Sequence, residues 1–162
     1  DFRAAERGFQ LLAQVAGRAG RTRPGRVIIQ AFDPDHYALQ AACRHDCGAF
    51  FDEEAPLRRD LGYPPYSRLC RLVVSSTNET AAGGFCRALA AVARKHLPQR
   101  GVRGPAPAPL SKLRGRYRWH LLLRGRLGAG LHGRVQLVLA EAERLPAAGV
   151  RLEVDVDPLD ML

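Results

Sequence analysis

The sequence lacks the features that mark membrane and secreted proteins. No apolar run approaches the roughly 18 residues that a membrane-spanning helix needs. No charged-then-apolar leader is visible, and the chain starts at "DFRAAE" without Met, so we expect an internal part of a longer protein. With 162 residues, 46% of them hydrophobic, the chain is large enough to bury a core.

Cysteine is scarce, and no C-x-x-C pair occurs. Cys43 and Cys47 flank His45, but on a helix the imidazole would point away from both thiols, which disfavours a shared metal ion. The other two cysteines are Cys70 and Cys86. Of the two interpretations, a metal site and buried thiols in a reducing cytoplasm, we favour the thiols and expect no bound metal.

Acidic residues are missing from the middle of the chain. No Asp or Glu occurs over the 61 residues from Thr80 to Ala140, and the net charge is +9. Of the 25 basic residues only Lys95 and Lys112 are lysines, and the other 23 are arginines. A GC-rich genome accounts for arginine in place of lysine, but it does not account for the missing acids. The span therefore predicts a polyanionic partner, because basic groups that neutralise phosphates release counterions.

The phosphate-binding loop G-x-x-x-x-G-K-[ST] is also absent, yet "QVAGRAGR" occupies the stretch from Gln14 to Arg21. If a helix continues to Gly20, Arg18 and Arg21 lie on one side of it. Gly17 and Gly20 leave room for a ligand to approach. Two converging guanidinium groups suit a triphosphate. An arginine-rich helix end that pairs with carboxylates is an equally open alternative.

The first third of the sequence predicts helices around one strand. Apolar residues at 3,4,3,4 spacing predict a helix over 2–17. The stretch "RVIIQAF" (26–32) predicts a strand covered on both faces, which is typical of a parallel sheet. Asp33, followed by a proline, is expected to cap a helical region that reaches about Asp60 and contains two helices. Its expected packing residues are Tyr37, Leu39, Phe50, Phe51 and Leu57.

The stretch "GYPPYS" (62–67) predicts a rigid turn and a domain boundary. Strands are expected beyond it at 67–75, 102–109, 116–124 and 150–156, and helices at 79–97 and 131–145. The prolines of 102–109 restrict that strand to a sheet edge. The order β-α-β-β-α-β predicts a ferredoxin-like sandwich, with both helices on one face of the sheet and the other face open.

Alternation within the strands assigns side chains to the two faces of this sheet. The last strand is expected to point Val150, Leu152, Val154 and Val156 inward, and Arg151, Glu153 and Asp155 to solvent. In 116–124, one face carries Tyr117, Trp119, Leu121 and Leu123, and the other carries Arg116, Arg118, His120 and Arg124. Because the aromatic rings share a face with leucines, we favour core packing for them over stacking on bases. The arginines suit a phosphate backbone better.

Gln14, Gly17, Arg18 and Arg21 also match the Q-x-x-G-R-x-x-R box of superfamily-two helicases. Further stretches make the resemblance more specific: "GRVIIQAFDPDHY", "RRDLGYPPYSRL", "GPAPAPLSKLRGRYRWHLLLRG" and "VDVDPLDML". Together they extend over essentially the whole chain. The chain resembles the C-terminal end of the PriA (primosomal protein N′) family of bacterial replication-restart helicases.

The resemblance implies an α/β and α+β chain in three parts. Residues 1–32 would be the end of a second RecA-like helicase lobe, with its arginine-finger motif and its last strand. Residues 33–62 would form a helical connector. Residues 63–162 would form the C-terminal DNA-binding domain with the ferredoxin-like β-α-β-β-α-β order.

The same resemblance implies the roles of single residues. Arg18 and Arg21 would be arginine fingers on the γ-phosphate of ATP, and Gln14 and Gly17 would belong to the same ATP-binding box. The parent would be an ATP-dependent 3′-to-5′ DNA helicase that recognises stalled forks and initiates primosome assembly. Its cofactors would be ATP, Mg²⁺ and zinc. Because the phosphate loop and the zinc cysteines belong upstream, residues 1–162 alone should neither hydrolyse ATP nor bind zinc.

The implied protein is a cytoplasmic monomer without membrane contacts. Its expected partners are DNA forks, single-stranded DNA, the single-strand-binding protein and other primosome proteins. The candidate DNA-binding residues are Lys112, Arg114, Arg116, Arg118 and Arg124. The alternative is a non-motor DNA- and protein-binding scaffold of the primosome, whose upstream sequence would lack the lysine loop and the D-E-x-H box.

Overall fold

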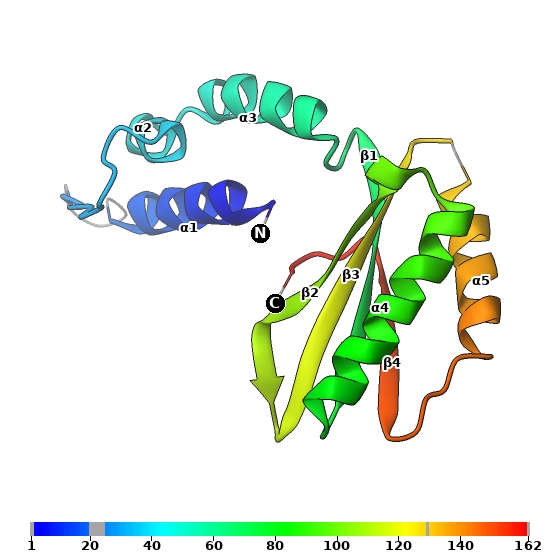
Figure 1. The fold of residues 1–162 in the computed structure, drawn as a ribbon. Coiled ribbons are helices and arrows are strands. Elements are labelled where there is room, and N and C mark those ends of the chain that lie inside the picture. The colour runs from blue at the N-terminus through cyan, green and yellow to red at the C-terminus, as the bar shows by residue number, and fades with distance from the viewer. Residues whose placement is uncertain (1, 20–24, 129, 162) are drawn as a thin grey trace. The chain divides into compact units, whose positions relative to one another are not determined.

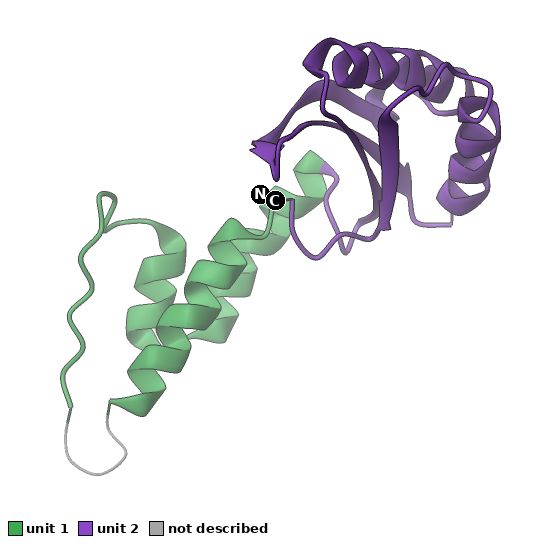
Figure 2. Ribbon diagram, turned by 90° about the horizontal axis from the view of Figure 1, so that it is seen from below, with its two compact units in different colours: residues 1–61 green, residues 62–162 purple. Residues whose placement is uncertain are grey.

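The structure is a computed structural model that describes residues 2–19, 25–128 and 130–161. It divides into two compact units, residues 1–61 and 62–162, which are coloured separately in Figure 2. We describe each unit by itself. None of the helices in the described ranges combines the length and the apolar character that a membrane crossing requires.

The first unit contains three helices, α1 (Ala4–Arg18), α2 (Tyr37–Arg44) and α3 (Cys47–Leu61). The helix expected at 2–17 and the two expected up to residue 60 are thereby confirmed. Phe9 of α1 stacks on Phe50 of α3 with 4.5 Å between the ring centroids, and both rings are buried. Small side chains of α2 complete this core: Ala38, Ala41 and Ala42.

The strand predicted over 26–32 is wrong. Residues 25–31 form neither helix nor strand, and Ile28 and Phe32 are 82% and 111% exposed. A buried parallel strand needs neighbouring strands to receive its backbone hydrogen bonds. The described residues of the first unit contain no other strand, so the apolar run has nothing to pair with there.

Three details of the helical region also differ from the predictions. The N-cap of α2 is His36 and not Asp33, because His36 Nδ1 accepts the Ala38 N–H at 3.2 Å. Phe51 and Leu57 were expected to pack, but they are 62% and 48% exposed. Of the three side chains of α3 that were expected to pack, only Phe50 belongs to the core cluster, while Phe51 and Leu57 lie on faces of the helix that are exposed to solvent.

The second unit alternates strands and helices along the chain (Figure 1). Its elements are β1 (Ser67–Ser76), α4 (Glu79–His96), the short 3₁₀ helix η1 (Gln99–Gly101), β2 (Val102–Leu113), β3 (Arg116–Arg126), α5 (Leu131–Ala142) and β4 (Val150–Val156). All four predicted strands and both predicted helices are present. The strands form an antiparallel sheet in the order β2-β3-β1-β4. The proline-containing strand β2 lies at an edge, as predicted.

Both helices of this unit cover the same face of the sheet (Figure 1). The core between them contains Leu72 and Val74 of β1 and Leu121 and Leu123 of β3. Trp119 packs against this core, which confirms the packing role expected for it, but Tyr117 is not part of the core cluster, so the same expectation is wrong for Tyr117. Burying such side chains accounts for most of the stability of a domain of this size.

Two expectations about side-chain faces are wrong. Val154 and Val156 of β4 are 41% and 49% exposed, because the core reaches only Val150 and Leu152 on this edge strand. The second face of the sheet is not open along its centre, where Leu69 and Val73 are 0% and 3% exposed. Strands β3 and β4 flank β1 on both sides, so their long side chains stand beside these positions.

Candidate nucleic-acid interface

The arginine box lies on the C-terminal half of α1. Gln14, Gly17 and Arg18 are all exposed, and Gln14 and Arg18 are one helical turn apart on the same side. A Cβ atom added to Gly17 would meet no atom within 4 Å. No carboxylate in the described ranges pairs with Arg18, so the alternative of a structural ion pair has no support from this arginine. Arg21 lies outside the described residues.

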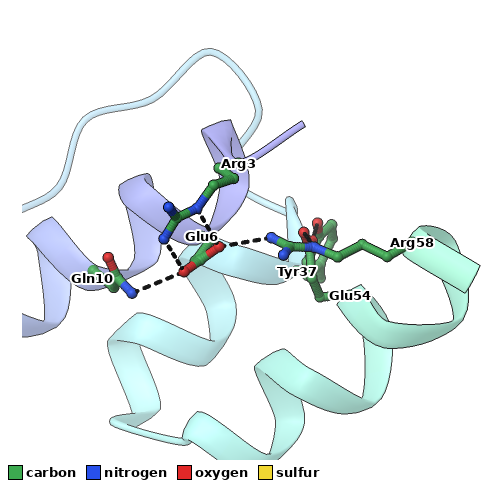
Figure 3. Close-up of polar contacts among 6 residues, drawn as sticks. All are labelled: Arg3, Glu6, Gln10, Tyr37, Glu54 and Arg58. Carbon is green, nitrogen blue, oxygen red and sulfur yellow. Dashed lines mark hydrogen bonds and ion pairs between the residues drawn. The ribbon is translucent and has the colours of Figure 1, made fainter. Parts of the chain in front are cut away.

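A charged network holds α1 against the other two helices of its unit (Figure 3). The carboxylate of Glu6 accepts Arg3 Nη2 at 2.8 Å and Arg58 Nη2 at 2.9 Å. Arg58 Nε also donates to Glu54 Oε1 at 2.6 Å, and the Tyr37 hydroxyl donates to the other oxygen of Glu54. Arg58 of α3 therefore bridges a carboxylate of α1 and one of its own helix, and Tyr37 ties α2 to the same group.

The network shifts the pKa values of its members. The hydrogen bond from Arg3 is the main cause that lowers the pKa of Glu6 to about 2, and Arg58 adds to it against the opposing effect of burial. Burial is the main cause that raises the pKa of Tyr37, and the hydrogen bond to Glu54 raises it further. The pair Glu6–Arg58 is mostly shielded, with 18% and 14% of the side chains exposed, so solvent screens it only partly.

Acid is expected to loosen α1 through Glu6. Because its pKa is lowered in the folded chain, Glu6 stabilises the fold above its unfolded pKa of about 4.3, and this stabilisation disappears as the pH falls toward 2. The full effect amounts to at most about 3 kcal/mol. Amide hydrogen-exchange protection of α1 between pH 6 and pH 3 measures it. Glu6→Gln should remove this pH dependence, whereas the exposed Asp52→Asn should keep it. An identical pH dependence for Glu6→Gln and the wild type contradicts the assignment.

Four of the five predicted DNA-binding residues gather at one end of the second unit. Lys112 is the second-last residue of β2, Arg114 lies in the hairpin turn with φ 49°, and Arg116 and Arg118 are the first and third residues of β3. In the sheet register, Arg118 lies opposite Ser75 of β1, and Ser75 lies opposite Arg151 of β4. We call these five residues the hairpin cluster: Lys112, Arg114, Arg116, Arg118 and Arg151.

The members of the hairpin cluster differ in how they are engaged. Arg116 donates to the backbone oxygens of Ser75 at 2.9 Å and Gly149 at 3.2 Å, so it fastens the end of β1 to the start of β4. Within the described ranges, the side chains of Arg114, Arg118 and Arg151 make no hydrogen bond or ion pair. Their guanidinium groups therefore keep their donors available for an external anion.

Arg124 does not join the hairpin cluster. It lies eight residues from Arg116 along β3, roughly 26 Å at the rise of a strand. Its guanidinium donates to the backbone oxygens of Gly62 at 3.4 Å and Arg100 at 3.3 Å. Arg124 therefore connects two backbone segments at the opposite end of the sheet.

The sequence pattern assigned no binding role to two residues near the cluster, Arg151 and His120. Arg151 was assigned only to solvent, although its alternation with valines already placed it on the face of Arg118. His120 carries a buried Nδ1 atom without a hydrogen-bond partner among the described atoms. Burial, followed by the nearby Arg71 and Arg118, lowers the pKa of His120. The alternation within a strand assigns each side chain to a face of the sheet, but it does not show which charged side chains of neighbouring strands lie close together.

A pocket of about 310 Å³ opens at the other end of the sheet. Its lining combines apolar side chains with a basic rim: Arg68, Cys70, Arg126, Gly128, Gly130, Leu131, His132, Val135 and Val156. Arg68 is fixed there by Asp157, whose carboxylate also accepts the Leu69 N–H at 3.3 Å. The geometry suits a chain end that has both apolar and acidic groups.

The cysteines divide between the surface and the core. Cys70 and Cys86 are buried, and burial raises the pKa of each thiol to about 11. Cys43, near the end of α2, and Cys47, the first residue of α3, are both exposed. The expectation that the thiols are buried is therefore wrong for these two cysteines. The described part of the chain holds no group of three or more His, Cys, Asp or Glu side chains placed to share a metal ion.

Comparison with known proteins assigns the family. The sequence model of the family described as the primosomal protein N C-terminal domain matches residues 59–159, which is more than half of the chain. The chain belongs to this family. The primosomal protein N C-terminal domain thus covers the whole sheet and both helices of the second unit, including every member of the hairpin cluster.

Curated relatives are similar to this chain over both units, and not only over the primosomal protein N C-terminal domain. The replication restart protein PriA of Synechocystis sp. is 40% identical over 163 residues, which cover 99% of this chain and 19% of the relative. PriA of Bacillus subtilis is 33% identical, with 100% of this chain and 20% of the relative covered. PriA of Treponema pallidum is 40% identical, with 100% and 25% covered. The chain spans a fifth to a quarter of the length of these relatives.

Proposed function

We propose that the second unit binds the phosphate backbone of DNA through the hairpin cluster. The observation that carries the proposal is the gathering of Lys112, Arg114, Arg118 and Arg151 at one end of the sheet. Three of these four side chains have no hydrogen bond or ion pair with described residues. Glu79 and Glu153 are acidic and lie near this end, but neither forms an ion pair with the cluster in the described ranges. Basic side chains gathered at one end of a sheet can provide sequence-independent affinity for phosphates.

The names of the relatives support a wider role. We infer that the natural protein acts in replication restart as an ATP-dependent 3′-to-5′ DNA helicase, which recognises stalled forks and initiates primosome assembly. In this proposal residues 1–32 are the end of a second RecA-like lobe, 33–62 a connector, and 63–162 a DNA-binding domain of ferredoxin-like type. It would work as a cytoplasmic monomer with other primosome proteins. The strand order and the family assignment support the last part most directly.

The exposed arginine box fits a nucleotide. Arg18 and Gln14 project from the same side of α1, and Gly17 leaves space beside them. With ATP and Mg²⁺ bound, the nucleotide supplies the γ-phosphate on which Arg18 would stabilise negative charge. Arg21 would be the second finger. We assign no zinc ligand to this chain, because Cys43 and Cys47 lack further ligands among the described residues.

The salt dependence of binding tests the proposed function. The chain is titrated into labelled single-stranded and duplex oligonucleotides at salt concentrations between 50 mM and 200 mM. If Lys112, Arg114, Arg118 and Arg151 each contact one phosphate, the logarithm of the binding constant should fall with a slope of about −3 to −4. Several unrelated oligonucleotide sequences should bind alike. A chain that binds no oligonucleotide, or binds without salt dependence, contradicts the proposal.

The pocket favours a second function, which is binding of the acidic tail of the single-strand-binding protein. Its basic rim would meet carboxylates, while Leu131, Val135 and Val156 would meet apolar side chains of the tail. An acidic, apolar-ended peptide should bind the chain, and Arg126→Ala should weaken this binding by about tenfold, as expected for loss of a charged hydrogen bond. Equal peptide affinities for Arg126→Ala and for the exposed control Arg144→Ala exclude the pocket.

A further inference from the structure

Two aromatic rings at the hairpin end of β3 each lie beside a basic side chain. Lys112 Nζ lies 4.5 Å from the centroid of the Tyr117 ring and donates to its hydroxyl at 3.2 Å. Arg87 Cζ of α4 lies 5.9 Å from the centroid of the Trp119 ring. Since Tyr117 and Trp119 are two residues apart on one strand, both rings face the helix side of the sheet.

The two rings are held differently. Trp119 packs against the core and against Gly83, where an added Cβ would come within 3.1 Å of the indole. Tyr117 is half-buried and joins neither buried core cluster of the described residues. Its cross-strand neighbours are Lys112 of β2 and Ser76 of β1. Lys112 is exposed and has a long, flexible side chain, so another group can displace its ammonium from the Tyr117 ring.

This arrangement matches the chemistry of an unpaired nucleotide. A base can stack on an exposed aromatic ring, and nearby basic groups can take the phosphates on either side of it. Lys112 lies on the Tyr117 ring, Arg114 lies in the hairpin turn three residues before Tyr117, and Arg87 lies beside the neighbouring Trp119. No acidic residue occurs from Thr80 to Ala140. In a duplex the faces of the bases are covered by their neighbours, so a duplex offers nothing to this ring.

We propose that Tyr117 is a base-stacking site for single-stranded DNA. A base replaces the Lys112 ammonium on the ring, and the displaced ammonium contacts the adjacent phosphate. Arg114 of the hairpin turn binds the next phosphate. The proposal rests on the proposed function, because it assumes that the hairpin end binds nucleic acid, and it adds a preference for single strands over duplex. Trp119 lies next to the site but keeps its packing role in the core.

The lone tryptophan makes the site observable, since Trp119 is the only Trp of the chain. The complete 162-residue chain is titrated with oligo(dT) and with a duplex of equal length while Trp119 fluorescence is recorded. Single strands should change the emission of Trp119, and the duplex should change it far less. Tyr117→Leu should weaken oligo(dT) binding at least about fivefold and leave duplex binding within about twofold. Tyr117→Phe, which keeps a ring, should bind like the wild type.

Matched variants separate the possible outcomes. Phe51→Leu removes an exposed ring in the first unit and should leave both affinities unchanged. Equal oligo(dT) affinities for Tyr117→Leu, Tyr117→Phe and the wild type overturn the stacking site, while salt-dependent binding of both DNA forms would leave the proposed function standing. Absence of any binding by the wild type overturns the proposed function itself. If Tyr117→Leu fails to fold, as judged by circular dichroism, reduced single-strand binding by the folded Tyr117→Ser variant supports the site, and unchanged binding overturns it.

Discussion

Replacing Arg18 with alanine in the natural protein that carries this sequence is expected to lower ATP turnover by about a thousandfold. The guanidinium of an arginine finger stabilises charge that develops on the γ-phosphate, so its loss acts on the reaction and not on DNA affinity. Arg18 suits this role because it is exposed and lies one turn from the equally exposed Gln14. DNA-stimulated phosphate release measures the effect, and a fluorescence titration checks that DNA affinity is unchanged.

The variant Arg44→Ala is the control for Arg18→Ala. Arg44 is an exposed arginine at the end of α2, and its side chain donates a hydrogen bond to Gln40, so its loss removes the same charge without changing the arginine box. Its ATP turnover should match the wild type. If Arg18→Ala also turns over ATP at the wild-type rate, the arginine box has no catalytic role and the scaffold alternative gains support.

Replacing Lys112, Arg114 and Arg118 together with alanine is expected to flatten the salt slope of DNA binding by about three. All three side chains lie at the hairpin end of the sheet, and in the proposed interface each would neutralise one phosphate. Arg116 is kept, because its contacts with Ser75 and Gly149 hold β1 and β4 together and its loss would disturb the fold. At low salt the affinity itself should fall by several orders of magnitude.

The control for this triple variant removes three arginines from the other end of the same sheet. Arg100, Arg103 and Arg126 are exposed and change the net charge by the same amount. If the hairpin cluster binds DNA, the control triple should keep nearly the whole salt slope. Equal slopes for the two triple variants would mean that only the overall charge of the chain matters.

The second unit was predictable because its strands and helices carry their own signals. Apolar spacing in 79–97 and 131–145, and the first half of the alternation in 150–156, reflect contacts that each element makes with one core. The prolines of β2 identified an edge strand for the same local reason. These signals do not depend on residues far away in the sequence, so all six predicted elements of this unit are present.

The predictions failed where an element depends on neighbours that the pattern cannot specify. The apolar run 27–29 has the composition of a covered strand, yet the described residues of the first unit contain no strand that could pair with it. In the same way, Val154 and Val156 alternate correctly but lie beyond the reach of the core. An apolar pattern indicates that a segment needs to be covered by other elements, but whether it is covered depends on the rest of the fold.

The site was predictable in composition but not in detail. Arg116 and Arg118 share a strand, a face and a residue type, and no sequence rule distinguishes them. The difference arises from Ser75 and Gly149, whose backbone oxygens lie within reach of Arg116 alone. Arg124 likewise belongs to the same face, but eight residues of strand separate it from the hairpin. Only the register of β1 with β3 and β4 shows which arginines remain available.

The location of the DNA-binding surface is the central claim, and amide chemical-shift mapping tests it most directly. A nitrogen-15-labelled chain is titrated with oligo(dT), and the shift of each backbone amide is followed. The largest shifts should occur over 112–118 and at Arg151, with little change over 124–134. The largest shifts at 94–100 or 124–134, with an unchanged hairpin, would contradict the claim.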